Sequence, residues 1–278
     1  MVDFQCKERY GYEDLLEIMR LLRAPGGCPW DREQTHASIR RNFLEETCEA
    51  VEAIDRQDPV GLCEELGDVL MQVVFHAQIE QEQGGFTMAD VIDGVCKKLV
   101  YRHPHVFGSV QVENSAEVLT NWEMLKRTEK GQRSTADAVD AVAKTLPALW
   151  RAEKMQSKAA KAGFQWSGGS LGELDKLEEE VGELRQSVEQ GCIDGPHGVR
   201  EEVGDVLFMA AKVAQVHGID PEEALHSACG KFARRFRGVE EGAGGTPLSS
   251  LSQEQLLELW AQAKAREKEQ SETREDTV

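Results

Sequence analysis

Aromatic residues, basic residues and long apolar runs are all scarce in this chain of 278 residues. Phe, Trp and Tyr make up 6% of the sequence, and 32 Lys plus Arg stand against 50 Asp plus Glu, which gives a formal charge of −18. Nucleic-acid binding needs a basic surface opposite the phosphates, so we expect no nucleic-acid partner. A small anionic substrate is still compatible with this charge if a metal ion supplies the positive charge.

No apolar run approaches the roughly 18 residues that a membrane-spanning helix requires, so we expect no membrane partner. The opening residues also lack the apolar stretch of a signal peptide. The seven cysteines are scattered and none forms a CxxC pair, which predicts reduced thiols in a cytoplasmic protein rather than disulfides or a zinc cluster. The phosphate-binding P-loop, HExxH and GxGxxG motifs are missing as well.

What is present favours helices, because helix-forming residues dominate and 40% of the chain is apolar. Prolines fall at expected helix ends, and apolar residues recur between them at intervals of three and four. Thr87 and Ser115 are expected N-caps, and Gly84 and Gly218 are expected C-terminal stops. The pattern predicts an all-α protein. Its expected helices lie near 12–24, 37–56, 59–83, 88–103, 115–130, 145–162, 171–190, 198–217, 221–239 and 252–268.

The two halves of the chain repeat the same segments in the same order. FLEETCEAVEAI (43–54) resembles LEEEVGELRQSV (177–188), and EELGDVLMQVV (64–74) resembles EEVGDVLFMAA (201–211). A short aromatic segment precedes each acidic helix, as GCPW in the first half and GFQW in the second. We infer a tandem duplication of one helical unit.

Each copy carries two pairs of acidic residues spaced i, i+3, so that both carboxylates of a pair lie on one side of a helix. A single such pair is more typical of a solvated face. However, counting about 100° per residue places all four pairs at the same edge of the expected apolar stripe. A short connection such as 56–59 makes consecutive helices antiparallel neighbours, so two such edges face each other. The pairs are Glu46 with Glu49, Glu65 with Asp68, Glu180 with Glu183, and Glu202 with Asp205.

Four neighbouring carboxylates repel one another and lose solvation unless a cation neutralises them. An all-oxygen site favours Mg²⁺, Mn²⁺ or Ca²⁺ over zinc. A di-iron bundle would need ExxH motifs, and the position after each acidic pair is never His. The spacing therefore predicts a site for a hard divalent cation in each copy.

Several longer strings are specific enough to compare with known families. They are GGCPWDREQTHASIRRNFLEETCEAVEAID, GDVLMQVVFHAQ and LVYRHPHVFG in the first copy, and KAGFQW, EEEVGEL, EEVGDVLF and KFARRF in the second. Together they resemble the MazG family of nucleoside triphosphate pyrophosphohydrolases, over about residues 8–268. The resemblance implies a tandem duplicated helical bundle of the all-α NTP pyrophosphatase type, which dimerises. MazG-like units are expected at 8–130 and 143–268, with a linker at 131–142 and a charged tail at 269–278.

The resemblance further implies that the chain hydrolyses nucleoside triphosphates, as NTP or dNTP, to the monophosphate and pyrophosphate with Mg²⁺, in nucleotide-pool cleansing. It implies that the metal ligands are Glu180, Glu183, Glu202 and Asp205, with Glu46, Glu49, Glu65 and Asp68 as the duplicate set. By the same resemblance, substrate contacts fall on Lys176, Lys231, Arg235 and Trp260, and on Lys98 and Arg102 in the first copy. Glu183 and Glu49 are the expected catalytic residues, each orienting and deprotonating a water.

Three questions stay open at this level. Trp30 and Trp166 are either aromatics that close the end of a bundle or platforms on which a base stacks. The basic pairs either form salt bridges to neighbouring acids or clamp a triphosphate. A non-catalytic nucleotide- or metal-binding module with a regulatory or dimerisation role is the alternative to an enzyme. Because the second copy is richer in cations and aromatics, we expect it to carry most of the turnover.

Overall fold

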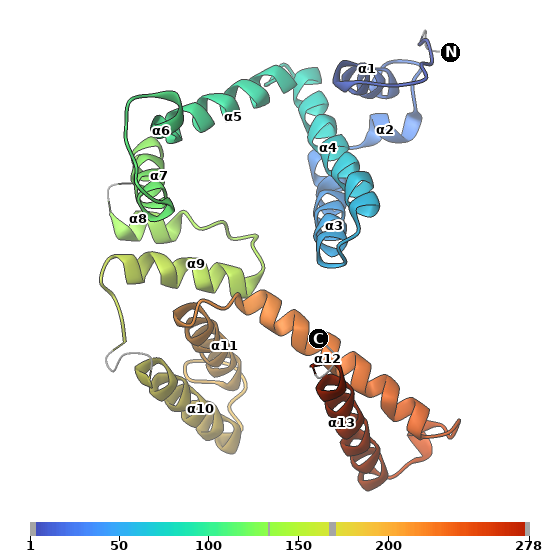
Figure 1. Ribbon diagram of the computed structural model, residues 1–278, viewed down its shortest axis with the longest axis vertical. Coiled ribbons are helices and arrows are strands. Elements are labelled where there is room, and N and C mark those ends of the chain that lie inside the picture. Colours follow the sequence, from blue (N-terminus) through green and yellow to red (C-terminus); the bar gives the residue numbers. More distant parts are fainter. Residues whose placement is uncertain (1–3, 133, 167–170, 276–278) are drawn as a thin grey trace. The chain divides into compact units, whose positions relative to one another are not determined.

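The computed structural model describes residues 4–132, 134–166 and 171–275. This part of the chain folds into α-helices α1 to α13 and one 3₁₀ turn, with no strand (Figure 1), so the expected all-α class is confirmed. It divides into two compact units, residues 1–126 and 127–278, which are described separately below.

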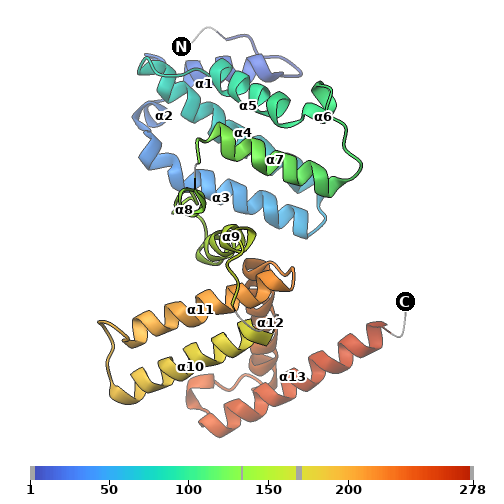
Figure 2. The same ribbon diagram turned by 90° about the vertical axis from the view of Figure 1, so that its left-hand side faces the viewer.

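The first unit is centred on the hairpin of α3 and α4, which pack along each other (Figure 2). Asp58 caps α4 by accepting hydrogen bonds from the amides of Val60 and Gly61, and Pro59 occupies the first helical position. This tight connection turns the chain back on itself. The helices of this unit are α1 (Tyr12–Arg23), α2 (Pro29–Glu33), α3 (His36–Asp55), α4 (Pro59–Glu82), α5 (Met88–Arg102), α6 (Pro104–Phe107) and α7 (Ser115–Glu129).

The second unit repeats the hairpin as α10 and α11, with α9 packed against α11. A further hairpin, α12 with α13, follows it, and α12 also contacts α9 and α11. The bounds are α8 (Thr135–Asp140), α9 (Ala148–Lys161), α10 (Gly172–Gln190), α11 (Val199–Val216), α12 (Pro221–Gly242), the 3₁₀ turn η2 (Leu248–Ser250) and α13 (Gln253–Glu275).

The core of the first unit forms where α1, α3 and α4 meet. Met19, Ile39, Val74, Phe75 and Ile79 are buried there, and side chains that include Met71 and Met88 pack around them. Burying such side chains contributes about 1.5–3 kcal/mol each, so this cluster fixes α1 across the far end of the α3–α4 hairpin. The end of the hairpin that bears the acidic pairs is left free of this core.

The expected helices are found within a few residues of their predicted ends. Thr87 caps α5, and Gly84 and Gly218 follow helices with the positive φ values of C-terminal stops. The N-cap expected at Ser115 is wrong, because Asn114 Oδ1 accepts the hydrogen bond from the amide of Glu117.

Three short helices were not expected: α2, α6 and α8. Residues 135–140, within the expected linker, form α8 and pack on α9, and the expected charged tail is helical as far as Glu275. All seven cysteines are free thiols, as the sequence predicts. Among the described residues, no helix combines the length and apolar character needed to cross a membrane.

Candidate metal and substrate site

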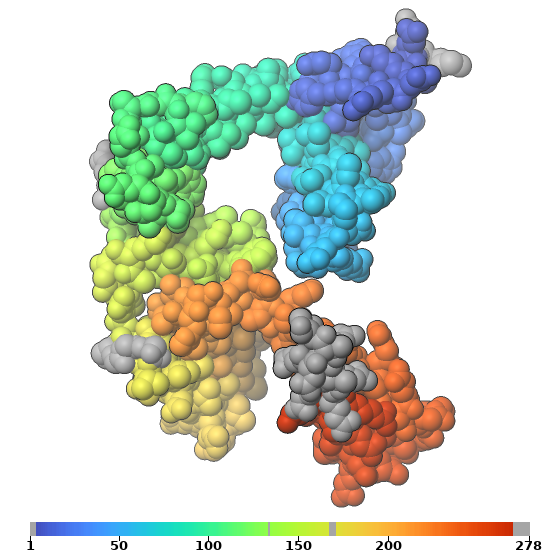
Figure 3. Space-filling model, viewed as in Figure 1, coloured from blue at the N-terminus to red at the C-terminus, as the bar shows by residue number. Residues whose placement is uncertain are grey.

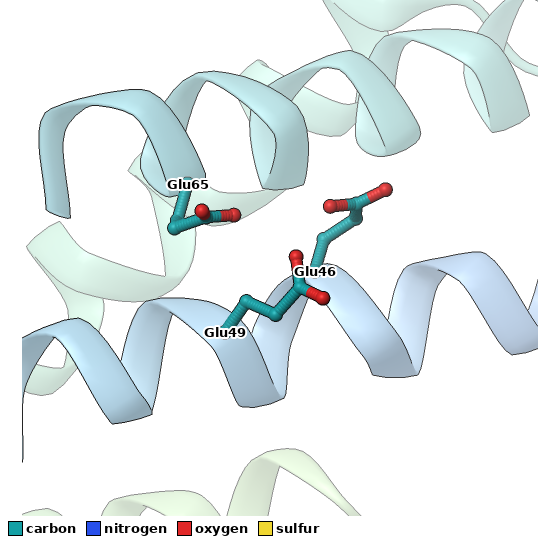
Figure 4. A group of neighbouring side chains, drawn as sticks. All are labelled: Glu46, Glu49 and Glu65. Carbon is teal, nitrogen blue, oxygen red and sulfur yellow. The ribbon is translucent and has the colours of Figure 1, made fainter. Parts of the chain in front are cut away.

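The hairpin of the first unit brings together glutamates from both of its helices. Glu46 and Glu49 of α3 and Glu65 of α4 point toward one another across the hairpin (Figure 4). One carboxylate oxygen of each lies within 4.8 Å of the others. Asp68 lies outside this group but close enough that its charge raises the pKa of Glu46. The i, i+3 spacing and the tight turn at Asp58 therefore bring together three of the four carboxylates that were expected from the sequence to meet.

The second unit repeats the cluster with deeper burial. Glu180 and Glu183 of α10 and Glu202 of α11 again place one oxygen each within 4.8 Å of the others. Glu180 is 7% exposed and Glu202 is 2% exposed, whereas Glu183 faces solvent. One oxygen of Glu202, Oε2, is buried and makes no hydrogen bond within the described residues. Such an oxygen is costly to bury unless a ligand completes it.

Burial and mutual repulsion raise the pKa of several members of both clusters. Desolvation raises the pKa of Glu183, and the charges of Glu180 and Glu202 add to the rise. Desolvation and then the charge of Glu180 raise the pKa of Asp205. In the first unit, desolvation raises the pKa of Glu46 and Glu65, with neighbouring carboxylates adding to both. A cation bound here would remove that repulsion.

Among the residues expected to contact the substrate, Lys176 lies directly at the second cluster. Its Nζ lies 2.8 Å from Glu180 Oε1 and 3.0 Å from Glu179 Oε1, and these hydrogen bonds raise the pKa of the lysine. The same Nζ stands 5.9 Å from the centre of the Trp166 ring. Lys176 therefore links the carboxylates to the aromatic segment before α10.

Sequence reasoning assigned no role at the site to two residues that touch the clusters. His197 Nδ1 lies 3.5 Å from Glu202 Oε1, at the turn that leads into α11. Gln72, buried one turn after Asp68, hydrogen-bonds with Glu46 and thereby opposes the rise in its pKa. The i, i+4 spacing from Asp68 could have drawn attention to Gln72, but a turn residue such as His197 gives no periodic signal.

The other expected substrate residues lie on helices outside the two hairpins. Arg235 of α12 pairs with Glu267 of α13 at 2.6 Å, and Lys231 is exposed on α12. Trp260 of α13 packs on Phe232 at 5.2 Å between ring centres.

In the first unit, Arg102 lies over the ring of Trp122, Lys98 is half-buried on α5, and Trp30 of α2 is 58% exposed. The structure thus gathers six glutamates and Lys176 at the two clusters. It places the remaining cations and aromatics on α2, α5, α12 and α13.

Oxygen ligands at this spacing suit a hard divalent cation. Mg²⁺ binds through a few carboxylates and keeps open positions for water or substrate phosphates. The unpartnered Glu202 oxygen and the raised pKa values of Glu183 and Asp205 both fit such an ion. Both groups consist of glutamates alone, without the His or Cys ligands that zinc sites usually have, and this disfavours zinc.

Fold and site together define a tandem all-α protein with a cluster of three carboxylates, suited to a divalent cation, in each of two repeated hairpins. A family model described as the MazG nucleotide pyrophosphohydrolase domain matches residues 34–107 and again residues 171–239. These two matches cover both carboxylate hairpins.

Related proteins match across nearly the whole chain. The nucleoside triphosphate pyrophosphohydrolase of Escherichia coli K12 is 44% identical over 257 residues, which are 91% of this chain and 97% of that protein. The nucleoside triphosphate pyrophosphohydrolase/pyrophosphatase MazG of Thermotoga maritima is 41% identical over 91% of this chain and 95% of its own length. The nucleoside triphosphate pyrophosphohydrolase of Mycobacterium tuberculosis is 33% identical over 90% of this chain and 68% of its own length. The chain belongs to the MazG family.

Proposed function

We propose that this protein hydrolyses nucleoside triphosphates, with ribose or deoxyribose, to the monophosphate and pyrophosphate, and serves nucleotide-pool cleansing. The observation that carries the proposal is the pair of glutamate clusters, each built from two helices with three carboxylate oxygens within 4.8 Å. The names of the Escherichia coli and Thermotoga maritima relatives support the substrate and the reaction. Family membership supports the same activity in both copies.

We propose Mg²⁺ as the cofactor, with Mn²⁺ as a substitute, held by Glu180, Glu183, Glu202 and Asp205 in the second copy. The duplicate ligands are Glu46, Glu49, Glu65 and Asp68. When bound, the ion supplies positive charge against the phosphate oxygens and stabilises the charge that develops there.

The remaining chemistry falls to side chains of the chain itself. Glu183 is exposed and its pKa is raised, which suits a carboxylate that takes the proton from the attacking water. As the water oxygen bonds to either the α- or the β-phosphorus, the anhydride bond between them breaks, and the monophosphate and pyrophosphate separate. Lys176 sits where it can offset negative charge on the phosphates, and Glu49 takes the role of Glu183 in the first copy.

We propose a homodimer, because the apolar stripes of both hairpins are uncovered in a single chain. Leu66 and Leu70 of α4 and Val203 and Leu207 of α11 expose 39–53% of their surface, at matching positions of the two repeats. The helices that bear them reach the surface of their own units in the space-filling view (Figure 3). Such apolar surface calls for a partner, and a second copy offers the same stripe in return.

The proposal also includes the remaining predicted substrate contacts. Lys98, Arg102, Lys231, Arg235, Trp30 and Trp260 are proposed to contact the nucleotide from the helices that flank the hairpins. The free cysteines fit the reducing cytoplasm, where we place the protein.

The test is product analysis with the full chain. ATP and dNTPs are incubated with Mg²⁺, Mn²⁺ or EDTA, and nucleotides, pyrophosphate and orthophosphate are separated by anion exchange. We expect monophosphate and pyrophosphate in equal amounts, only with a divalent ion. Glu202→Gln should remove most of the activity, because the first copy keeps its own ligands, while Glu189→Gln on the exposed face of α10 should leave the activity at the wild-type level.

Diphosphate with orthophosphate, or full activity in EDTA, would contradict the proposal. Binding of nucleotide without turnover would favour the alternative, a non-catalytic regulatory or dimerisation module.

A further inference from the structure

The second unit contains a cavity of about 150 Å³ between α8, α9 and α11. Its walls include the aromatic rings of Phe164, Trp166 and Phe208. Phe164 is 59% exposed, so the cavity is bordered by a residue at the surface rather than sealed inside the unit. A cavity of about this volume accepts a single aromatic ring in other proteins.

Two buried polar side chains interrupt these apolar walls. Gln156 of α9 is 7% exposed, and its Nε2 donates a hydrogen bond to the carbonyl oxygen of Phe208 at 2.7 Å. That bond fixes the orientation of the amide, and it leaves Oε1 buried with no hydrogen bond among the described residues. An unsatisfied buried acceptor costs free energy that a ligand with an N–H group can recover.

Lys212 of α11 is the second polar group. It is 4% exposed, and its Nζ donates to Gln215 Oε1 at 2.8 Å. Because an ammonium carries three donors, Lys212 keeps the capacity to donate to a ligand. The cavity therefore combines aromatic surfaces, one free acceptor and one cationic donor, which is the pattern of a site that orients a flat polar ring.

The cavity is joined to the carboxylate cluster by short contacts. Trp166 forms one wall, Lys176 Nζ stands 5.9 Å from its ring centre, and the same Nζ bonds Glu180 at 2.8 Å. On the other side, Lys212 lies seven residues after Asp205 on α11, about two turns along one face of the helix. A ligand whose phosphates bind a cation held by the cluster can therefore place its other end in the cavity.

The first unit differs at the matching position. The two repeats can be aligned on their Gly-Asp dipeptides, Gly67–Asp68 and Gly204–Asp205. In this alignment Phe75 of the first unit corresponds to Lys212 of the second. Phe75 is 5% exposed in the core of the first unit, with Arg23 over its ring at 5.2 Å. A core phenylalanine replaces the cationic donor there.

We propose that this cavity receives the nucleobase of the substrate, and that Gln156 and Lys212 recognise its polar edge. The inference rests on the proposed function for the triphosphate, and it adds specificity-determining residues to it. Every nucleobase presents an N–H donor beside an acceptor, which Gln156 Oε1 and Lys212 Nζ can meet together, while Trp166 and Phe208 contact the ring.

The experiment compares nucleotides with a substrate that has no base. Steady-state kcat/KM is measured with the full chain for ATP, GTP, CTP, UTP and ribose 5-triphosphate. The variants are Gln156→Leu and Lys212→Met, and their matched controls are Gln186→Leu and Lys154→Met at exposed positions of the same unit. We expect wild type to prefer its best nucleotide over ribose 5-triphosphate at least 10-fold.

Each variant should lose about 10-fold of that preference, the effect of one hydrogen bond to the base, and change ribose 5-triphosphate hydrolysis less than twofold. The two controls should keep the wild-type ratio. Equal loss on all five substrates would overturn the inference, because Gln156 and Lys212 would then support the fold or the chemistry rather than base recognition. An unchanged ratio in both variants would overturn it as well.

A wild type that cleaves none of the five substrates would refute the proposed function separately from the base pocket. Equilibrium dialysis with the four nucleoside monophosphates then decides the pocket. Weaker binding to Gln156→Leu than to Gln186→Leu supports it, and equal binding overturns it.

Discussion

Replacing Glu202 by glutamine should make the metal-free protein more stable, although it removes a proposed metal ligand. Glu202 is 2% exposed, one of its oxygens makes no hydrogen bond among the described residues, and two other carboxylates lie within 4.8 Å. Glutamine keeps the shape of the side chain and one acceptor oxygen, replaces the other oxygen by an NH₂ donor, and removes the charge. The change therefore isolates the electrostatic cost of the cluster.

The size of that cost follows from the distances. Two unit charges about 4.8 Å apart repel by roughly 3 kcal/mol at an effective dielectric constant of 20. Lys176 beside Glu180 offsets part of this repulsion, as does uptake of protons by members whose pKa is raised. We expect a net gain of about 1–2 kcal/mol in the free energy of unfolding, which corresponds to a rise in Tm of about 2–8 °C for a unit of this size.

Thermal unfolding followed by circular dichroism measures the effect. In EDTA, Glu202→Gln should have a higher Tm than wild type. The control Glu178→Gln, at an exposed position of α10, should have the same Tm as wild type. Adding Mg²⁺ should raise the Tm of wild type and of Glu178→Gln more than that of Glu202→Gln, in which only the first cluster keeps its proposed ligands, because a ligand stabilises only the state that binds it. A lower Tm for Glu202→Gln in EDTA would refute the reasoning, since the carboxylate would then stabilise the fold.

Three further outcomes are expected. Glu183→Ala should lower kcat by orders of magnitude on the same nucleotides while Glu49→Ala keeps most of it, and the opposite result would reverse the assignment of turnover to the second copy. Because the pKa values of Glu183 and Asp205 are raised in the folded state, metal-free stability in urea should fall as pH rises from about 4 to 7, and saturating Mg²⁺ should flatten that slope. Leu207→Glu should yield monomers in sedimentation velocity without loss of helical circular dichroism, because Leu207 is 50% exposed in a single chain; an unchanged dimer would place the interface elsewhere.

The helices could be predicted closely because their signals are local. Asp58 with Pro59, Thr87, Gly84 and Gly218 mark ends through their own backbone and side-chain hydrogen bonds. The short helices α2, α6 and α8 are too brief to show an apolar period, and they form around Pro29, Pro104 and the cap at Ser134. Asn114 displaced Ser115 as the cap because both residues can accept the same bond, one position apart.

The meeting of the glutamates was also within reach of sequence reasoning, because it needs only the i, i+3 spacing and a tight turn. The surroundings of the cluster were not, since they depend on which long side chains reach it. Arg235 pairs with Glu267, thirty-two positions further along the chain, and no periodic pattern selects that partner. The cavity beside Trp166 likewise depends on residues of α8, α9 and α11 that are far apart in sequence.

The different burial of the two clusters has a cause that can be traced to single positions. Lys176 stands four residues before Glu180, and the matching position before Glu46 is Asn42. His197 stands five residues before Glu202, and the matching position before Glu65 is occupied by an apolar side chain, Val60. Buried carboxylates need a cation or hydrogen-bond donors near them, and the second copy supplies both partners to the two glutamates that it buries.

The first copy has neither a lysine nor a histidine at these places, and its glutamates stay half-buried or exposed, with Gln72 as a neutral partner for Glu46. A more deeply buried cluster holds its charges in a lower dielectric, where a bound cation and a phosphate interact more strongly. Placing lysine at position 42 and histidine at position 60 should therefore draw the first cluster toward the properties of the second. The measurement is the Mg²⁺-dependent rise in Tm of a chain that already carries Glu202→Gln, in which the first cluster alone can respond. No change in that rise would show that the difference between the copies comes from the surrounding helices and not from these two positions.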